Sequence, residues 1–266
     1  MHLLRILHDV PLWLVTLAVV ATAEIYSVGL MVLARRVYGV SRLSSNNEVA
    51  GFKFAVVGLF YGVLLAFVVI AVWEDLHRTE GAVRSEAKAA VDLHHLTLAL
   101  PEKGGDEIHQ LLTVYVQSVT KYEWPTMALG EASDDVAADL VRLSQAIFKI
   151  EPEDERDLAL YQQALRLLTV ITDSRNERLD AAEGSVPRFL WFVLIAGGAI
   201  TLGYPAFFGA TNLGAQILMT ASLAALVSLS FALALAFDYP FTGSEHISVA
   251  PFDKALQQMQ QSLPTP

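Results

Sequence analysis

The sequence predicts an all-α membrane protein, with four transmembrane helices and a helical extramembrane domain inserted between the second and the third. Composition is the first observation behind this prediction. Of 266 residues, 54% are hydrophobic and 17% are charged, and the mean hydropathy is +0.44. Soluble domains carry nearer one quarter charged residues. The second observation is that the apolar residues are concentrated in four nearly uncharged runs, each long enough to cross the hydrocarbon core of a bilayer.

The predicted transmembrane helices cover residues 10–34, 49–73, 187–208 and 213–237. Helices buried in a soluble core are the alternative, but four such runs would leave too little chain to cover them. The first run does not fit a signal peptide, because it is too long and contains Glu24. The third contains Gly197-Gly198 and Pro205, so its last turns are expected to be kinked or unwound. We therefore expect a multi-pass membrane protein in contact with the lipid bilayer.

The predicted extramembrane domain, residues 74–185, is distinguished by its negative charge. Residues 74–184 hold 22 of the 28 acidic residues and 11 of the 18 basic ones, which gives a formal charge of −11. The whole chain has a formal charge of −10. This balance argues against nucleic acid as a partner, because phosphate contacts need a basic surface.

Helical patterns fill this domain. Residues 74–100 contain no proline and are predicted to continue the second transmembrane helix, with Pro101 and the glycine pair at 104–105 ending it. Further helices are predicted at residues 106–123, after an N-cap at Ser133, and at residues 153–182. The expected buried faces of the last two helices are Val136, Leu140, Leu143 and Ile147, and then Leu158, Tyr161, Leu165, Leu168 and Ile171. The C-terminal tail, residues 238–266, has one amphipathic stretch at 252–259.

The second transmembrane helix has two distinct faces. The first, the small-residue ridge, consists of Gly51, Ala55, Gly58, Gly62 and Ala66. A second helix can approach closely along such a ridge. The adjacent bulky stripe consists of Phe52, Val56, Phe60, Val63, Phe67, Ile70 and Glu74. These side chains either line a narrow apolar neck around an oligomer axis, which can gate a pore by dewetting, or contact lipid or a neighbouring helix, as apolar stripes commonly do.

Glu24 is the one acidic residue deep inside a predicted span. A carboxylate in that environment is costly and faces the bundle interior or water, so it is a candidate functional residue. One interpretation is a site for a proton or a cation. The other is a protonated or hydrogen-bonded structural glutamate, with Tyr26, Ser27 or a hydroxyl of another span as its partner.

The sequence gives no support for an enzyme. It contains no glycine-rich nucleotide loop, no Gly-x-Ser-x-Gly and no His-Glu-x-x-His motif. It also contains no cysteine, which excludes a thiol nucleophile and a cysteine-ligated zinc. His77, His94, His95 and His109 lie among polar residues that we expect to be exposed, without metal-ligand spacing. We predict no catalytic residue, no metal site and no cofactor.

Short motifs in a fixed order carry a family resemblance. The motifs are Asn46-Asn47-Glu48 before the second span, Glu123-Trp124-Pro125 and Arg175-x-x-Arg178 in the acidic domain, and Asp238-x-Pro240-Phe241-x-Gly243 after the fourth span. In this order they resemble the bacterial bestrophin-like membrane proteins. The resemblance covers nearly the whole chain.

The resemblance implies a ring-shaped homo-oligomer that conducts inorganic ions. Bestrophins proper are pentameric anion channels with an aromatic and aliphatic neck on the second transmembrane helix, which by position maps to Phe60, Val63 and Phe67. The acidic domain favours a different ion, because a ring of such domains concentrates cations and repels anions. We therefore expect a channel that leans toward cations. The alternative is a non-conducting membrane scaffold or sensor whose acidic domain binds a partner.

Five of the motif residues are expected to shape the backbone. Pro125 disfavours the helical conformation at the residue before it, so Trp124 is predicted to leave the helix and to pack as an anchor between helices or subunits. Asp238, Pro240 and Gly243 predict a turn that leads to a docked tail.

The two motif arginines are expected to form ion pairs. Arg175 and Arg178 are three residues apart, so they share one face of the last domain helix. Their candidate partners are Glu74, Glu86 and Glu123. Such pairs would hold the helices of the acidic domain together.

Four spans place the N-terminus, the acidic domain and the C-terminus on one side of the membrane. The resemblance to bestrophins makes that side cytoplasmic. Charge gives the opposite indication, because Arg35, Arg36, Arg42 and Lys53 crowd the short first loop. Basic residues of the acidic segment, namely Arg78, Arg84, Lys88, Arg175 and Arg178, point the other way, although charges in a long segment count for less. We predict the cytoplasmic side.

Overall fold

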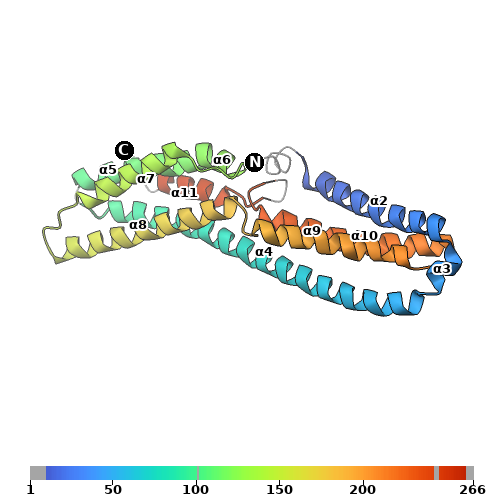
Figure 1. Cartoon of the computed structure of the whole chain (residues 1–266). Helices are drawn as coiled ribbons and strands as arrows, with labels where there is room; N and C mark the ends of the chain where they lie inside the picture. Colours follow the sequence, from blue (N-terminus) through green and yellow to red (C-terminus); the bar gives the residue numbers. More distant parts are fainter. Residues whose placement is uncertain (1–9, 101, 243–245, 262–266) are drawn as a thin grey trace. The chain divides into compact units, whose positions relative to one another are not determined.

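The computed structural model describes residues 10–100, 102–242 and 246–261. All regular secondary structure in these residues is helical (Figure 1). The helices long and apolar enough to cross a membrane are α2 (Leu12–Tyr38), α4 (Asn47–Thr97), α9 (Arg188–Gly203) with the 3₁₀ turn η2 (Tyr204–Phe207), and α10 (Leu213–Asp238). The all-α class is therefore confirmed, and four helices could cross a membrane by their length and composition.

The remaining helices are α3 (Val40–Ser44), α5 (Glu102–Ser118), the π-helix η1 (Val119–Glu123), α6 (Trp124–Met127), α7 (Asp134–Phe148), α8 (Glu155–Ala182) and α11 (Ala250–Gln261). The chain divides into two compact units. We call residues 10–74 and 185–238 the apolar unit, and residues 75–184 and 239–261 the acidic unit.

In the apolar unit, α2 packs along α10 and also contacts α9 and η2. The first part of α4 contributes one buried face to this unit. That face consists of Tyr61, Leu65, Val68 and Val72, which recur at helical spacing. It packs with Leu194 of α9 and Ala234 of α10, so one side of the helix is covered by the chain's own fold.

The glycine pair of α9 makes room for the Tyr61 side chain and does not bend the helix. Helix α9 stays regular through Gly197 and Gly198. A Cβ atom on Gly197 would lie 2.9 Å from the ring of Tyr61, and one on Gly198 would lie 2.9 Å from the Tyr61 hydroxyl oxygen. The expected irregular end occurs later, at η2, which contains Pro205. The glycines are therefore explained by the close approach of one aromatic ring.

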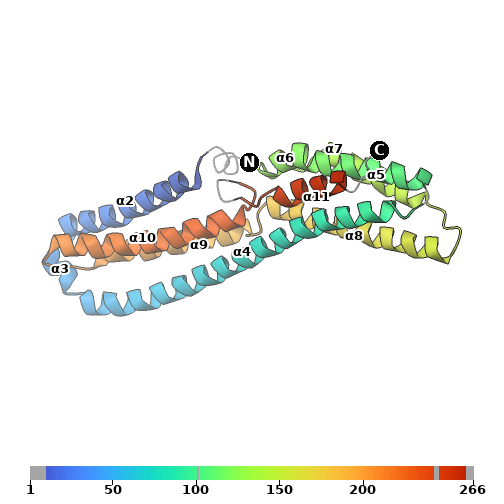
Figure 2. The same cartoon turned by 180° about the vertical axis from the view of Figure 1, so that it is seen from behind.

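The acidic unit has one shared core. Its fully buried members include Leu93, Ile108, Leu112, Leu143, Ile147, Ile171 and Phe252. Helix α11 lies along α5 (Figure 2) and buries Phe252, Ala255 and Met259, so the amphipathic stretch of the tail docks as expected. The predicted face of α7 is buried as well. Leu158 of α8 is 45% exposed instead of buried, because the first turns of α8 face solvent and full burial begins only at Ala164.

The helix boundaries after residue 97 differ from the prediction in one respect. Helix α4 continues without interruption to Thr97, as expected. Helix α5 already begins at Glu102, so the glycine pair at 104–105 lies inside it. A Cβ atom on Gly105 would lie 2.5 Å from the carbonyl oxygen of Thr97. This glycine is therefore required for close packing at the end of α4, and it does not end a helix.

Candidate functional site

The bulky stripe of α4 is exposed on the apolar unit. All seven of its members are solvent-accessible, with Phe52, Phe60 and Phe67 exposed to 76%, 75% and 68%. The buried face of the same helix, which includes Tyr61 and Val72, points elsewhere on the helical wheel. The fold of one chain therefore leaves these large aromatic side chains uncovered.

The small-residue ridge is also uncovered. No other atom lies within 4 Å of the positions that Cβ atoms would take on Gly58 and Gly62. At Gly51 only the ring of Phe208 comes as near as 3.9 Å. Ala55 and Ala66 are exposed. The ridge is thus open for a helix that does not belong to this chain's own fold.

Glu24 lies half-buried on α2. The two neighbours proposed as its partners bond elsewhere. The Tyr26 hydroxyl donates to the carbonyl of Ala199 at 3.1 Å, and the Ser27 hydroxyl donates to the carbonyl of Leu202 at 2.6 Å. Both bonds tie α2 to α9. Among the described residues, Glu24 has neither a hydrogen-bond nor an ion-pair partner.

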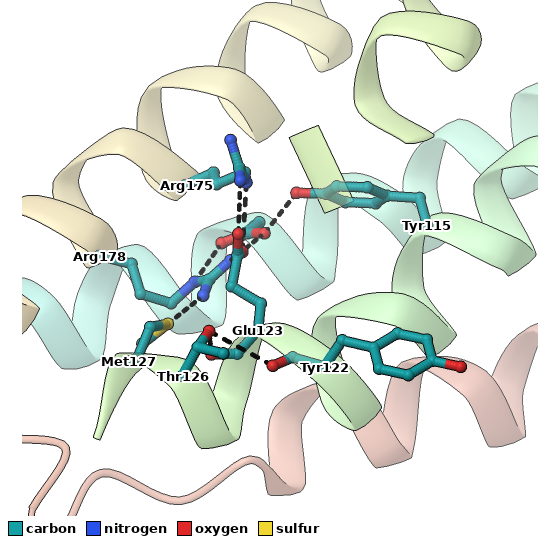
Figure 3. Close-up of polar contacts among 8 residues, drawn as sticks. Tyr115, Tyr122, Glu123, Thr126, Met127, Arg175 and Arg178 are labelled. Atoms are coloured by element: carbon teal, nitrogen blue, oxygen red, sulfur yellow. Dashed lines mark hydrogen bonds and ion pairs between the residues drawn. The ribbon is translucent and has the colours of Figure 1, made fainter. Parts of the chain in front are cut away.

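The motif arginines form a buried ion-pair network in the acidic unit (Figure 3). Arg178 donates through Nε to Glu86 at 2.8 Å and through Nη2 to Glu123 at 2.8 Å. Arg175 donates to the same Glu123 through Nε at 3.2 Å and also through Nη2. The Tyr115 hydroxyl donates to Glu86 at 2.6 Å. The expected pairs with Glu86 and Glu123 are therefore present and join α4, η1 and α8.

This network balances two carboxylates with two guanidinium groups. Arg178, Glu86 and Glu123 have no exposed surface. Burial opposes the charge of Arg178, but Glu86 and Glu123 outweigh it and raise the arginine's pKa above its ordinary value. Burial, followed by the charge of Glu86, raises the pKa of Tyr115 well above its ordinary value. Both shifts favour a charged Arg178 and a neutral Tyr115.

The third expected partner is not part of this network. Glu74 lies at the exposed end of the bulky stripe. Tyr115 was not predicted as a member, although its place on the apolar face of α5, between Leu112 and Val119, indicated burial. A buried tyrosine needs a hydrogen-bond partner for its hydroxyl. The sequence could not show that Glu86 supplies it.

Trp124 stays helical, contrary to the prediction. Its backbone angles are φ −58° and ψ −47°. The π-helix η1 widens the preceding turn, and Pro125 falls in the first turn of α6, where its missing N–H needs no partner. The ring packs edge-on against Phe241 at 5.5 Å and Phe252 at 5.8 Å. The anchor therefore joins helices of the acidic unit to the tail.

Asp238 is a cap within the apolar unit. It is the last residue of α10 and only 2% exposed. One carboxylate oxygen accepts from the backbone N–H groups of Ser185 and Val186, each at 2.8 Å, and the other accepts from Nε1 of Trp191 at 3.2 Å. The predicted turn follows it and includes Pro240, but Gly243 lies outside the described residues. The carboxylate thus fixes the start of α9 to the end of α10.

One pair of histidines contradicts the expected exposure. His94 is fully buried, and its Nδ1 lies 2.8 Å from Nδ1 of His109. Burial, then His109 and His95, lower the pKa of His94 to about 4. One ring nitrogen of this pair donates and the other accepts. The described residues contain no group of three or more side chains that could hold a metal ion.

Comparison with known proteins places the chain in a family. The bestrophin-like domain matches residues 21–252. A crystal structure of a bacterial bestrophin homologue from Klebsiella pneumoniae aligns with a TM-score of 0.65 and 14% identity, covering 91% of this chain and 97% of that one. A point variant of that homologue aligns with a TM-score of 0.66 and 15% identity, covering 91% of this chain and 98% of the variant. No curated protein matches significantly. The chain therefore belongs to the bestrophin-like family of multi-pass membrane proteins.

Proposed function

We propose that the chain forms a ring-shaped homo-oligomer that conducts inorganic ions across the cell inner membrane. Family membership supports this function, because bestrophins proper are ion channels. In this assembly the four apolar segments cross the bilayer at residues 10–34, 49–73, 187–208 and 213–237. Residues 74–185 form a cytoplasmic domain, and residues 238–266 form the C-terminal tail. The pore is lined by α4.

The observation that carries this proposal is the uncovered ridge of α4. Lipid contact alone explains exposed phenylalanines, because acyl chains accept any apolar side chain. It does not explain a row of glycine and alanine, because the glycines lower helix propensity and neither residue type offers much apolar surface to lipid. Close contact with a neighbouring helix explains the row. When the ridge around Gly58 and Gly62 contacts a neighbouring protomer, the adjacent stripe that contains Phe60 and Phe67 turns toward the ring axis.

Charge supports a preference for cations. The segment of residues 74–184 has a formal charge of −11. Several copies around one axis create a negative potential that raises the local concentration of cations. Glu74 ends the bulky stripe and adds a ring of carboxylates at that position. A reversal potential that favours chloride over potassium would contradict this part of the proposal.

The neck is tested by widening it. In liposomes containing the purified protein, Phe60→Ala and Phe67→Ala are expected to raise potassium flux severalfold, because a wider and less apolar constriction stays wet. The matched control is Leu226→Ala, since Leu226 is 66% exposed on α10 and belongs to neither face of α4. Equal effects of Leu226→Ala and Phe60→Ala would show that the stripe does not line the pathway.

A second function is favoured by exposed apolar side chains on the acidic unit. Val141 and Phe148 of α7 are 54% and 61% exposed. Such residues are suited to binding another protein. A ring that is intact but passes no ion in the liposome assay would favour a membrane scaffold or sensor over a channel.

A further inference from the structure

The apolar unit contains a cavity of about 380 Å³ at the start of α4 and α10. Its walls include Phe54, Phe208, Met219 and Leu223, together with the polar residues Asn47 and Thr220. The cavity therefore lies at one end of helices that can cross a membrane, next to the short loop between the first two of them. Its lining is largely apolar, as expected for a site that takes a hydrocarbon chain.

One polar group faces this cavity without a partner. Thr220 is only 4% exposed, and its hydroxyl has no hydrogen-bond partner among the described residues. Most serine and threonine hydroxyls of the spans donate back to their own helix, as Ser228 does to Ala224 at 2.6 Å. The described residues contain no buried side-chain oxygen or nitrogen without a partner, so the Thr220 hydroxyl oxygen is accessible and can bond to a ligand or to water in the cavity.

The cavity is rigidly built. The Asn47 side chain donates to the carbonyl of Gly209 at 2.8 Å and accepts from its N–H at 2.9 Å. The Gln216 amide donates to the carbonyl of Phe208 at 2.7 Å and accepts from Arg35 at 2.9 Å. These bonds hold the loop between η2 and α10 in place. The hollow is therefore not a gap in a loosely packed loop.

The surroundings of the cavity are positively charged, in contrast to the chain as a whole. Residues 35–53 contain four basic side chains and one acidic one. Half-buried Arg35 donates only to neutral acceptors, namely Gln216 and the carbonyls of Ala210 at 2.5 Å and Thr211 at 3.3 Å. Within the described chain, none of the four cations lies within ion-pair distance of a carboxylate. Three of them, Arg36, Arg42 and Lys53, are exposed.

We propose that this cavity binds an anionic phospholipid. An acyl chain fills the apolar hollow, the Thr220 hydroxyl donates to an ester carbonyl, and the phosphate pairs with Lys53 and Arg42. Lys53 adjoins the wall residue Phe54 in sequence, and Arg42 lies on α3, whose backbone contacts Gly209 of the cavity wall. A bilayer lipid is favoured over a soluble ligand, because the walls belong to membrane-crossing helices and the cations lie at their ends.

The test counts bound lipids on the purified full chain by native mass spectrometry, after exchange into phosphatidylglycerol or phosphatidylcholine. The wild type is expected to retain phosphatidylglycerol preferentially. Each removed cation should weaken that preference about fivefold, so the double variant Lys53→Gln, Arg42→Gln should lose about 25-fold. Arg188→Gln is the matched control, because Arg188 is exposed at the other end of α9. Thr220→Val should weaken retention of both lipids, and Leu223→Trp should abolish it by filling the hollow.

Three results would overturn the proposal. If the wild type and the double variant retained both lipids equally, the proposed pairing of the phosphate with Lys53 and Arg42 would be wrong. Displacement of phosphatidylglycerol by millimolar inorganic phosphate would identify a site for the free anion. A change in subunit number in Leu223→Trp, with unchanged lipid retention, would assign the hollow to a side chain of a neighbouring copy. Unaltered elution and thermal unfolding of Thr220→Val show that the lipid count is not a folding effect.

Discussion

Arg178 is a charged side chain with no exposed surface, and its presence in the core depends on Glu86 and Glu123. Arg178→Met retains the bulk but leaves Glu86 without a cationic partner among the described residues and Glu123 with Arg175 alone. Removing one partner of a buried pair costs about 3–5 kcal/mol. We expect a loss of this size in the free energy of unfolding, measured by thermal or denaturant unfolding of the detergent-solubilised protein.

The control for this prediction is Arg166→Met on the exposed face of α8. Among the described residues, Arg166 bonds only to Gln163 at the surface, so its removal should change stability by less than about 0.5 kcal/mol. If Arg178→Met and Arg166→Met have the same free energy of unfolding, the ion pairs of the buried network contribute nothing to stability beyond packing. An unfolding temperature raised by Arg178→Met would mean that the desolvation of the four charges outweighs their attraction.

His94 gives the acidic unit a pH dependence of known sign. Its pKa is lowered from 6.5 to about 4 in the folded chain, so the unfolded chain binds more protons between these values. The stabilisation from neutral His94 is complete above pH 6.5 and is lost as the pH falls toward 4, by at most about 3 kcal/mol. His94→Gln should flatten the fall in unfolding temperature between pH 7 and pH 4.5.

Other groups titrate in the same pH range, so the control variant must retain all of these titratable side chains. His77→Gln removes an exposed histidine from the same helix and retains every carboxylate. It should follow the pH profile of the wild type. Identical pH profiles for His94→Gln and His77→Gln would show that the contact between His94 and His109 does not contribute to the free energy of unfolding between pH 7 and pH 4.5.

Glu24 has two open interpretations, and one substitution distinguishes them. If the carboxylate binds a proton or a cation during conduction, Glu24→Gln changes the size of the flux or its pH dependence in the liposome assay. If the residue is a protonated structural glutamate, the isosteric amide leaves both unchanged. Unchanged transport at every pH from 5 to 8 would exclude Glu24 from the conduction mechanism.

At the level of the helix, the ridge of α4 predicts how the protein assembles. Gly58→Leu and Gly62→Leu place side chains where the single chain has open space, so they should leave the subunit folded but block close helix contact. We expect smaller assemblies by light scattering or native mass spectrometry. Gly29→Leu on α2 is the matched control, because that glycine also has no neighbouring atom within 4 Å. Rings of normal size in Gly62→Leu would refute the role of the ridge.

Helices were predictable where the apolar period alone decides the structure, and less so where a contact between helices decides it. The four spans, the face of α7 and the docked tail follow from local patterns. The glycine pairs at 104–105 and 197–198 look like breakers in sequence, but Gly105 and Gly197 accommodate a carbonyl and a tyrosine ring. Trp124 remains helical because a π turn precedes it, and no sequence pattern indicates that turn.

For the whole molecule, the sequence located the candidate surfaces but not the buried polar contacts. The ridge and the stripe are visible as periodic residue types on α4, and the structure leaves both exposed. Glu86 and Glu123 were among three candidate partners for the motif arginines, and only the fold selects two of them. The contact of His94 with His109 joins residues fifteen apart on different helices, which spacing within one helix cannot predict.

The buried network around Arg178 has no net formal charge, and this affects which charged residues can change during evolution of the family. Its two carboxylates and two guanidinium groups cancel, so the excess acid of residues 74–184 lies elsewhere in that segment. The charges that hold the core together are therefore separate from those that create the outward potential. Relatives can exchange acidic surface residues for basic ones, and under the proposed function change the permeant ion, while inheriting the same scaffold.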